Sequence, residues 1–382
     1  MKITKVEAIE LRLPESEISE TIDMWIRDAL IVKIHTDEGI IGIGDADSCP
    51  RIVKAVIEAP FSHGAVSGLG RLLIGMNPLD IGVINEKLYQ STFYYGRGGH
   101  GPLIHAIAAI DVALWDIAGK YYNQPIYQLL GGAFNKKIRA YASVDFGKNG
   151  NETCEIGKKW ISKGFTAVKF GWMPKGLSEK MELDLVEGAR NGIGKENDLL
   201  IDGGCCWDTM TAIRRVKQFE PYNLLFLEEP LEGHNMEGYR RLSNVSKIPL
   251  AAGEGHPGRF ECKDLIEQSG ISVVQVDIAR SGFTEAVKIA DIAEDHGLRV
   301  ANHFYSTGIN LAAGLHWLAS RKSAFIFEYC LMDTPLRFNL TKQVIEPDTN
   351  GFLHVPEGPG LGVDLNENIM DKYLVKTTAI GE

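Results

Sequence analysis

Three short apolar runs in the middle of the chain each end in a carboxylate, and this repeat constrains the fold more than any other feature. The runs are L-L-I-D-G-G, which contains Asp202, L-F-L-E-E-P, which contains Glu228 and Glu229, and P-L-A-A-G-E-G, which contains Glu254. Their period of roughly 25 residues suits a strand followed by a helix. The repeat therefore predicts carboxylates that converge at one end of a parallel barrel. Oxygen ligands gathered in this way are typical of a site for a divalent cation such as Mg²⁺.

The same pattern continues over the rest of the chain from Lys136 onward. Strand-like runs alternate there with helical segments, and the runs cover residues 138–144, 167–172, 199–202, 225–230, 250–254, 272–277, 299–304 and 324–330. Eight strands at this period are the count of a (β/α)₈ barrel, or of a variant that lacks one helix. A doubly wound sheet would need a glycine-rich phosphate turn after an early strand, which this sequence lacks. We therefore predict an α/β barrel.

The first 134 residues have a different pattern. Residues 3–11 alternate between apolar and polar side chains, as in a half-buried strand. Two further strand-like runs flank Asp37-Glu38-Gly39, where the glycine permits a tight turn. Residues 51–122 then show helical periodicity, and Ile104–Tyr121 is the most apolar helix. Three antiparallel strands followed by helices predict an α+β domain.

Charge and cysteine content argue against several classes of protein. The formal net charge of −10 disfavours nucleic acids and anionic membranes as partners. The six cysteines form no C-x-x-C pair, which favours reduced thiols over a disulfide framework. The N-terminus lacks a signal-peptide pattern, and we find no apolar stretch of the ~20 residues that a membrane span needs. We expect a cytoplasmic protein that binds neither nucleic acid nor a membrane.

Ionisable side chains recur at the predicted ends of the barrel strands, where barrel enzymes place their chemistry. In chain order they are Lys169, Asp202, Glu228, Glu254, Asp277, His303 and Glu328. A buried acid at each strand end costs several kcal/mol unless it is paired or binds a metal. Helix caps or surface ion pairs explain single members of this set, but they do not explain the whole set. We therefore predict an active site.

Chemistry suggests a role for each member. Asp202, Glu228 and Glu254 form a three-carboxylate metal site, and Asp277 and His303 follow consecutive strands. The aspartate can hold one ring nitrogen of the histidine and leave the other as an acid or base.

Two members of the set lie outside the metal site and the pair. Lys169 supplies a cation that faces the metal and can bind a substrate carboxylate. Glu328 would have to be protonated to donate a hydrogen bond to an enolate, and otherwise it pairs with a cation.

Several motifs make the chain similar to the enolase superfamily, and within it to the mandelate racemase subgroup that includes acid-sugar dehydratases. They are A-I-A-A-I-D-V-A-L-W-D-I-A-G-K from Ala106, P-I-Y-Q-L-L-G-G from Pro125, D-I-A-R-S-G-F-T-E-A-V-K-I-A from Asp277, A-N-H from Ala301 and V-P-E-G-P-G-L-G from Val355. The resemblance covers nearly the whole chain. It implies an α+β capping domain at residues 1–134, joined by a returning segment at 336–382. It also implies a modified barrel of the (β/α)₇β type at 135–335.

The resemblance also implies a chemistry. Mg²⁺ would bind Asp202, Glu228 and Glu254, Asp277 and His303 would form a dyad, and Glu328 would donate to the enolate. The shared step is removal of the proton α to a carboxylate. The family's habit leads us to expect a homo-oligomer and a small carboxylate substrate.

One departure from the family pattern favours a particular reaction. The racemase pattern has Lys-x-Lys on the second strand, whereas this chain has Lys169-Phe170-Gly171. A racemase needs a base on each face of the substrate, and this chain offers only His303 beside a lysine suited to the carboxylate. Dehydration of a sugar acid to a 2-keto-3-deoxy acid needs one base and an acid. We therefore predict a Mg²⁺-dependent acid-sugar dehydratase. A racemase or epimerase of a 2-hydroxy acid, or a relative without turnover, are the alternatives.

Residues that select the substrate are harder to find in the sequence. Trp25, Arg27 and Asp47 fall where capping loops would close over the barrel mouth, and His256 follows Glu254 by two positions. Each is a candidate for substrate binding, and each also has an ordinary structural explanation.

Overall fold

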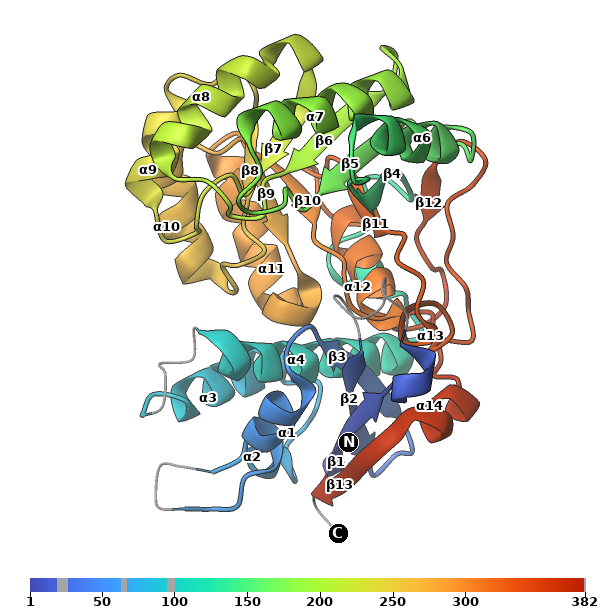
Figure 1. Cartoon of the computed structure of the whole chain (residues 1–382). Helices are drawn as coiled ribbons and strands as arrows, with labels where there is room; N and C mark the ends of the chain where they lie inside the picture. Colours follow the sequence, from blue (N-terminus) through green and yellow to red (C-terminus); the bar gives the residue numbers. More distant parts are fainter. Residues whose placement is uncertain (19–26, 63–66, 95–99, 381–382) are drawn as a thin grey trace.

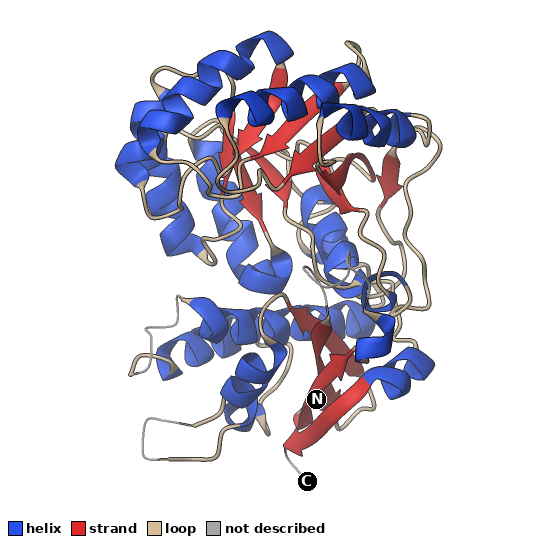
Figure 2. Ribbon diagram, viewed as in Figure 1, coloured by secondary structure: helices blue, strands red, loops and turns tan. Residues whose placement is uncertain are grey.

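The computed structural model describes residues 1–18, 27–62, 67–94 and 100–380, and it contains two sheets (Figure 1). One is a barrel of parallel strands, and the other is a smaller antiparallel sheet that lies below the barrel in the view (Figure 2).

The barrel has eight parallel strands that neighbour one another in chain order. They are β4 (Lys137–Asp145), β5 (Ala167–Gly171), β6 (Asp198–Asp202), β7 (Leu224–Glu228), β8 (Leu250–Ala252), β9 (Val273–Val276), β10 (Arg299–Asn302) and β11 (Phe327–Cys330). Strand β11 pairs with β4, and the Glu328 N–H donates to the Asn302 side chain across β10 and β11 at 2.8 Å. Strands covered on both faces are apolar at nearly every position, which explains the continuous apolar runs.

Seven helices connect these strands and surround the barrel (Figure 1). They are α6 (Gly150–Ile161), α7 (Glu179–Ile193), α8 (Thr209–Phe219), α9 (Met236–Ser243), α10 (Arg259–Ser269), α11 (Ile278–Asp295) and α12 (Gly308–Ala319), with the 3₁₀ turn η2 (Glu220–Tyr222) after α8. Eight strands with seven connecting helices confirm the predicted (β/α)₇β architecture.

The antiparallel sheet has the strand order β13-β1-β2-β3. Its strands are β1 (Ile3–Arg12), β2 (Asp28–Thr36), β3 (Ile41–Ala46) and β13 (Leu374–Ile380). The helices in this part of the chain are α1 (Pro50–Glu58), α2 (Leu69–Leu73), α3 (Ile81–Ser91), α4 (Gly101–Tyr122) and α5 (Ile126–Leu129), with the 3₁₀ turn η1 (Glu15–Glu17) after β1. The α+β character predicted for this part of the chain is therefore present.

The last part of the chain returns from the barrel to this sheet, as the red ribbon in Figure 1 shows. After α13 (Pro335–Phe338), β12 (Phe352–His354) pairs with β4, α14 (Glu367–Tyr373) follows, and β13 pairs antiparallel with β1. The glycine-rich loop on this path is structural. Its Gly360 accepts a hydrogen bond from the Ile126 N–H at 3.0 Å, and the Leu361 N–H donates to Asp116 at 2.9 Å.

Helix α4 is the central helix of the N-terminal part, and it packs between the antiparallel sheet and α11 (Figure 1). The Thr284 N–H of α11 donates to Asp111 of α4 at 2.9 Å. This helix has the length and apolarity of a membrane span, contrary to our expectation from the sequence. Its most apolar window is 72% buried within the protein, as in a core helix.

The end of β3 reaches the mouth of the barrel. Asp45 accepts hydrogen bonds from Ser306 at 3.1 Å and Thr307 at 2.7 Å, both of which follow β10. The Asp47 N–H donates to the Ala279 carbonyl at the start of α11, at 3.3 Å. The antiparallel sheet therefore delivers acidic side chains to the ends of the barrel strands.

Candidate active site

The structure places all seven of the predicted strand-end residues at the carboxyl ends of the barrel strands or within the strands just before those ends. Each is at most 8% exposed: Lys169, Asp202, Glu228, Glu254, Asp277, His303 and Glu328. Parallel strands that close into a barrel bring these ends to one mouth, so residues far apart in sequence become neighbours.

Lys169 in β5 is the centre of one cluster. Its Nζ lies 2.6 Å from Glu228, 2.7 Å from Glu328 and 3.5 Å from Asp202. Burial by itself would lower the pKa of Lys169, but the nearby carboxylates outweigh burial and hold it well above its ordinary value. In this structure Lys169 is therefore a positive charge paired with buried carboxylates.

Glu328 is held by the same lysine and by two further donors. Burial raises the pKa of Glu328, but the charges of Lys169 and His303 outweigh burial and hold it below its ordinary value. Ser143 donates to one carboxylate oxygen at 2.9 Å, and the Phe304 N–H donates to the other at 2.9 Å. Of the two roles considered from the sequence, this geometry favours pairing with a cation.

The three carboxylates expected to bind a metal lie at the ends of consecutive strands: Asp202 and Glu228 are the last residues of β6 and β7, and Glu254 follows β8. Burial raises the pKa of Asp202 to about 6 and that of Glu228 to about 7, and burial raises that of Glu254 well above its ordinary value. The Oε2 atom of Glu228 is buried and accepts no hydrogen bond from a described residue. Hard oxygen donors and an unsatisfied buried acceptor together fit a divalent cation such as Mg²⁺.

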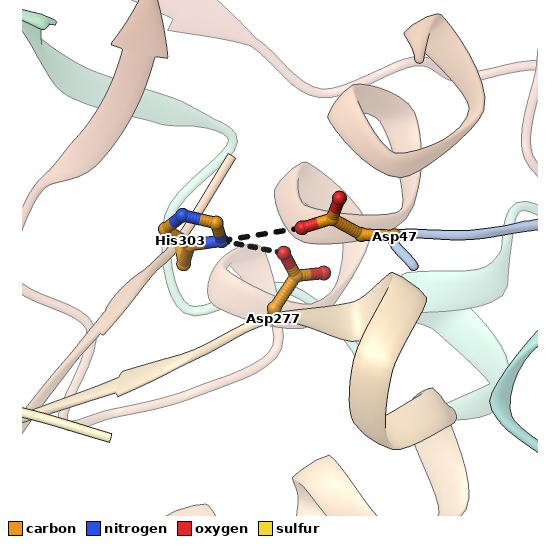
Figure 3. Close-up of side chains that lie close together, drawn as sticks. All are labelled: Asp47, Asp277 and His303. Carbon is orange, nitrogen blue, oxygen red and sulfur yellow. Dashed lines mark hydrogen bonds and ion pairs between the residues drawn. The ribbon is translucent and has the colours of Figure 1, made fainter. Parts of the chain in front are cut away.

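The closest group of potential ligands among the described residues is a different one. The ligand atoms of Asp47, Asp277 and His303 all lie within 4.8 Å of one another (Figure 3). Ion pairs account for this grouping, because His303 lies close to both aspartates and Arg280 contacts Asp47. The three carboxylates expected from the sequence do not form such a group among the described residues, and they contact Lys169 or His303 instead.

Asp277 and His303 form a hydrogen-bonded pair. The Asp277 Oδ2 atom lies 2.6 Å from His303 Nδ1, and its Oδ1 accepts from the Ala279 N–H at 2.7 Å and from Asn310 at 3.0 Å. His303 Nε2 lies 3.5 Å from Glu254. Nδ1 is thus held by the aspartate, and Nε2 is the nitrogen that faces the metal ligands.

The charges around His303 set its protonation. Burial lowers its pKa, but the carboxylate of Glu254 and the hydrogen bond that Nδ1 donates to Asp277 outweigh burial and raise it to about 10. Arg280 opposes this rise. Tyr305 stacks on the imidazole, with ring centroids 5.3 Å apart, and keeps the ring in its plane.

Arg280 is a site residue that our interpretation of the sequence missed. Its Nη2 lies 2.7 Å from Asp47, and its Nη1 donates to the Glu254 carbonyl at 3.1 Å. It follows Asp277 by three positions at the start of α11, and helical spacing of three residues could have indicated it. Asp47 itself reaches the site from β3, and its carboxylate lies 3.9 Å from His303 (Figure 3).

The remaining candidates for substrate binding have different outcomes. Trp25 lies outside the described residues. Arg27 is half-buried just before β2, and its carbonyl accepts from the Leu13 N–H at 2.8 Å. His256 is buried, and its Nε2 lies 3.0 Å from the carbonyl of Gly233 beside a cavity of about 430 Å³.

The chain combines a (β/α)₇β barrel with an N-terminal domain that places Asp47 at the barrel mouth. Together with the ionisable residues at the strand ends, this is the architecture of an enzyme of the enolase type. Residues 154–369 match the family model of the enolase C-terminal domain-like family, and residues 18–131 match the N-terminal domain of mandelate racemase and muconate lactonizing enzyme. The chain belongs to the enolase superfamily, in its mandelate racemase subgroup.

Relatives with known names cover almost the whole chain. D-galactonate dehydratase of Pectobacterium atrosepticum is 34% identical over 97% of this chain and 94% of its own length. D-galactarolactone cycloisomerase of Agrobacterium fabrum is 29% identical over 98% of this chain and 99% of its own length. The crystal structure of the 3,6-anhydro-D-galactonate cycloisomerase from Zobellia galactanivorans matches with a TM-score of 0.88 and 30% identity, over 98% of this chain and 100% of that one.

Proposed function

We propose that this protein is a Mg²⁺-dependent dehydratase that converts a sugar acid to a 2-keto-3-deoxy acid and water. One observation carries the choice of reaction. The described site contains a single oriented base, His303, because Lys169 is held as a cation by Glu228 and Glu328. The second lysine of the racemase pattern is replaced by Gly171. One base suits elimination better than inversion, which needs a base on each face.

In this proposal Asp202, Glu228 and Glu254 hold the Mg²⁺ ion. When bound, the ion supplies positive charge that makes the proton α to the substrate carboxylate more acidic. Lys169 adds a second fixed positive charge in a buried place, where charge interactions are strong. It lies ready to donate hydrogen bonds to a substrate carboxylate.

His303 performs the proton transfers. With a cation bound to Glu254, the charge that raises the pKa of His303 would be offset, and Nε2 would then be able to accept a proton. Asp277 keeps the ring oriented and stabilises its charged form. Nε2 takes the C2 proton and returns it to the C3 hydroxyl, which leaves as water. The C2–C3 enol then becomes the ketone, so hydrogen and oxygen balance.

The parts of the chain have distinct tasks in this proposal. Residues 135–335 form the catalytic barrel, and residues 1–134 with the returning segment 336–382 form the cap. A homo-oligomeric, cytoplasmic enzyme without nucleic-acid or membrane partners stays a prediction from the sequence.

Elimination of a ring oxygen instead of a hydroxyl is the second candidate, and the names of the two cycloisomerase relatives favour it. One experiment separates the reactions. Sugar acids and their lactones or anhydro forms are incubated with the protein and Mg²⁺ in D₂O, and products are followed by NMR. A keto acid with loss of water supports the dehydratase, and ring opening or closure without loss of water supports the cycloisomerase. Deuterium at an inverted C2 supports a racemase or epimerase. Absence of every product and of exchange contradicts all three.

A further inference from the structure

A cavity of about 600 Å³ lies at the ends of the barrel strands, and one of the residues that line it, Gly171, packs against the proposed metal ligand Asp202. It is formed by the ends of β4 and β5 and by the turn after β6. The side chains and backbone that matter here are those of Asp145, Phe146, Gly171, Trp172, Lys175 and Gly204. None of these residues takes part in the proton transfers proposed above.

Gly171 joins this cavity to the active site. A Cβ atom placed there would lie 2.8 Å from the Cβ and 3.2 Å from the Oδ2 of Asp202, closer than packed atoms approach. The backbone of β5 is therefore in contact with the metal ligand. Any side chain at this position would collide with Asp202, so glycine is the residue that lets the end of β5 pack against this carboxylate. A substrate held at Asp202 can extend its remaining carbons into the cavity.

Asp145 is the acidic side chain that lines this cavity, and Lys175 is the basic one. Asp145 ends β4, directly opposite Gly171 in the register of β4 and β5. Its carboxylate makes no hydrogen bond or ion pair with any other described residue, although Asp145 is half-buried. Burial raises the pKa of Asp145 to about 6. A partly buried carboxylate without a donor is costly, and a ligand that donates to it recovers this cost.

The cavity walls are aromatic. Phe146 lies on one side, and Trp172, which is 44% exposed, lies against Gly204 on another. Flat apolar rings around one hydrogen-bond acceptor suit a carbon chain that carries C–H groups on one side and hydroxyls on the other.

We propose that this cavity is the subsite for the distal, hydroxyl-bearing carbons of the substrate, and that Asp145 is a specificity-determining residue that accepts a hydrogen bond from one of those hydroxyls. The inference rests on the proposed function and narrows its substrate class to aldonic acids with an uncharged tail. A diacid would place its second carboxylate beside Asp145. Lys175 is too exposed to offset this repulsion, since solvent screens its charge.

Equilibrium binding tests this subsite without requiring turnover. The parent protein for the test carries His303→Asn, and calorimetry in Mg²⁺ measures its affinity for glycerate, for the stereoisomeric hexonates and for the matching hexarates. At least one hexonate should bind tenfold or more tightly than glycerate and than its hexarate. Asp145→Leu should remove most of this advantage and change glycerate binding less than about twofold. Asp145→Asn, which keeps an acceptor oxygen, should have a smaller effect.

Asp295→Asn is the matched control, because Asp295 is exposed at the end of α11, far along the chain from the cavity. It should leave every affinity unchanged. The subsite is wrong if no hexonate binds better than glycerate, if a hexarate binds best, or if Asp145→Leu weakens glycerate and hexonate equally. If hexonates bind as expected and the wild-type protein forms no keto acid, dehydration fails and the subsite stands. If keto acid forms while the hexonate preference survives Asp145→Leu and Asp145→Asn, the subsite fails and dehydration stands.

Discussion

The Oδ2 atom of Asp277 lies 2.6 Å from Nδ1 of His303, and this contact determines which ring nitrogen faces the metal ligands. The aspartate is itself fixed by the N–H of Ala279 and the amide of Asn310. Asp277 is the N-cap of α11, so the helix fixes the aspartate and the aspartate in turn orients the imidazole of His303 without a substrate.

Asp277→Asn should lower kcat by about 10²- to 10⁴-fold, which is the usual contribution of a positioned acid or base. An asparagine keeps an oxygen for the cap of α11, but it cannot stabilise the charged imidazole. Keto-acid formation from the best sugar acid measures the loss. His303→Asn should abolish turnover and leave metal binding intact. Substantial activity in His303→Asn would show that another residue is the base.

Mg²⁺ should stabilise the folded protein, because it neutralises buried carboxylates that are costly without it. At one hundred times its dissociation constant, a ligand that binds only the folded state adds about 2.7 kcal/mol to the free energy of unfolding. Urea unfolding with and without Mg²⁺ measures this gain. Glu228→Gln should remove most of it, whereas Glu155→Gln on the exposed face of α6 should retain it. Equal gains in both variants would place the ion elsewhere.

His316 should make the protein less stable as the pH falls from about 6.5 to 4. Burial lowers the pKa of His316 from 6.5 to about 4, so the unfolded chain binds a proton in this range that the folded protein excludes. The full shift corresponds to about 3 kcal/mol. The imidazole Nε2 lies 3.0 Å from the Leu361 carbonyl, and Nδ1 accepts from the Tyr127 N–H.

The matched variant is His316→Gln, which keeps a donor and an acceptor but does not titrate. Urea unfolding of both proteins across this pH range gives the difference in free energy of unfolding. As the pH falls, the free energy of unfolding of the wild-type protein should decrease more than that of His316→Gln. A constant difference would mean that His316 titrates alike in both states.

Gly360→Ala should destabilise the protein more than Gly176→Ala does. Both glycines have positive φ angles, 69° and 82°, which cost any other residue about 1 kcal/mol. An added Cβ at Gly360 would also overlap the Asp116 carboxylate, whereas nothing lies within 4 Å of one at Gly176. Urea unfolding should show the extra loss for Gly360→Ala. Equal losses would mean that the loop around Gly360 can move away from Asp116 of α4 without a cost in stability.

The pattern of strands, acids and helices was sufficient to predict the barrel and the ends of its strands. Apolar runs of strand length are a local property, and the βα period is short, so both are visible without any long-range contact. The same reasoning placed Lys169, Asp202 and His303 at one mouth, because parallel strands that close a barrel present their carboxyl ends together. The fold class and the membership of the family followed from these residues and the motifs around them.

Only the tertiary structure decided how these groups pair. Lys169 takes Glu228 and Glu328 as partners because their side chains reach the same depth inside the barrel, which strand order alone does not specify. Asp47 meets Arg280 because the end of β3 docks on the loops after β9 and β10, more than two hundred residues later. The sequence by itself determined which strand-end side chains line the barrel mouth, but Arg280 was not predicted from it. Their partners, and hence their charge states, depend on the docking of the cap and on burial, because both act between segments that are distant in the chain.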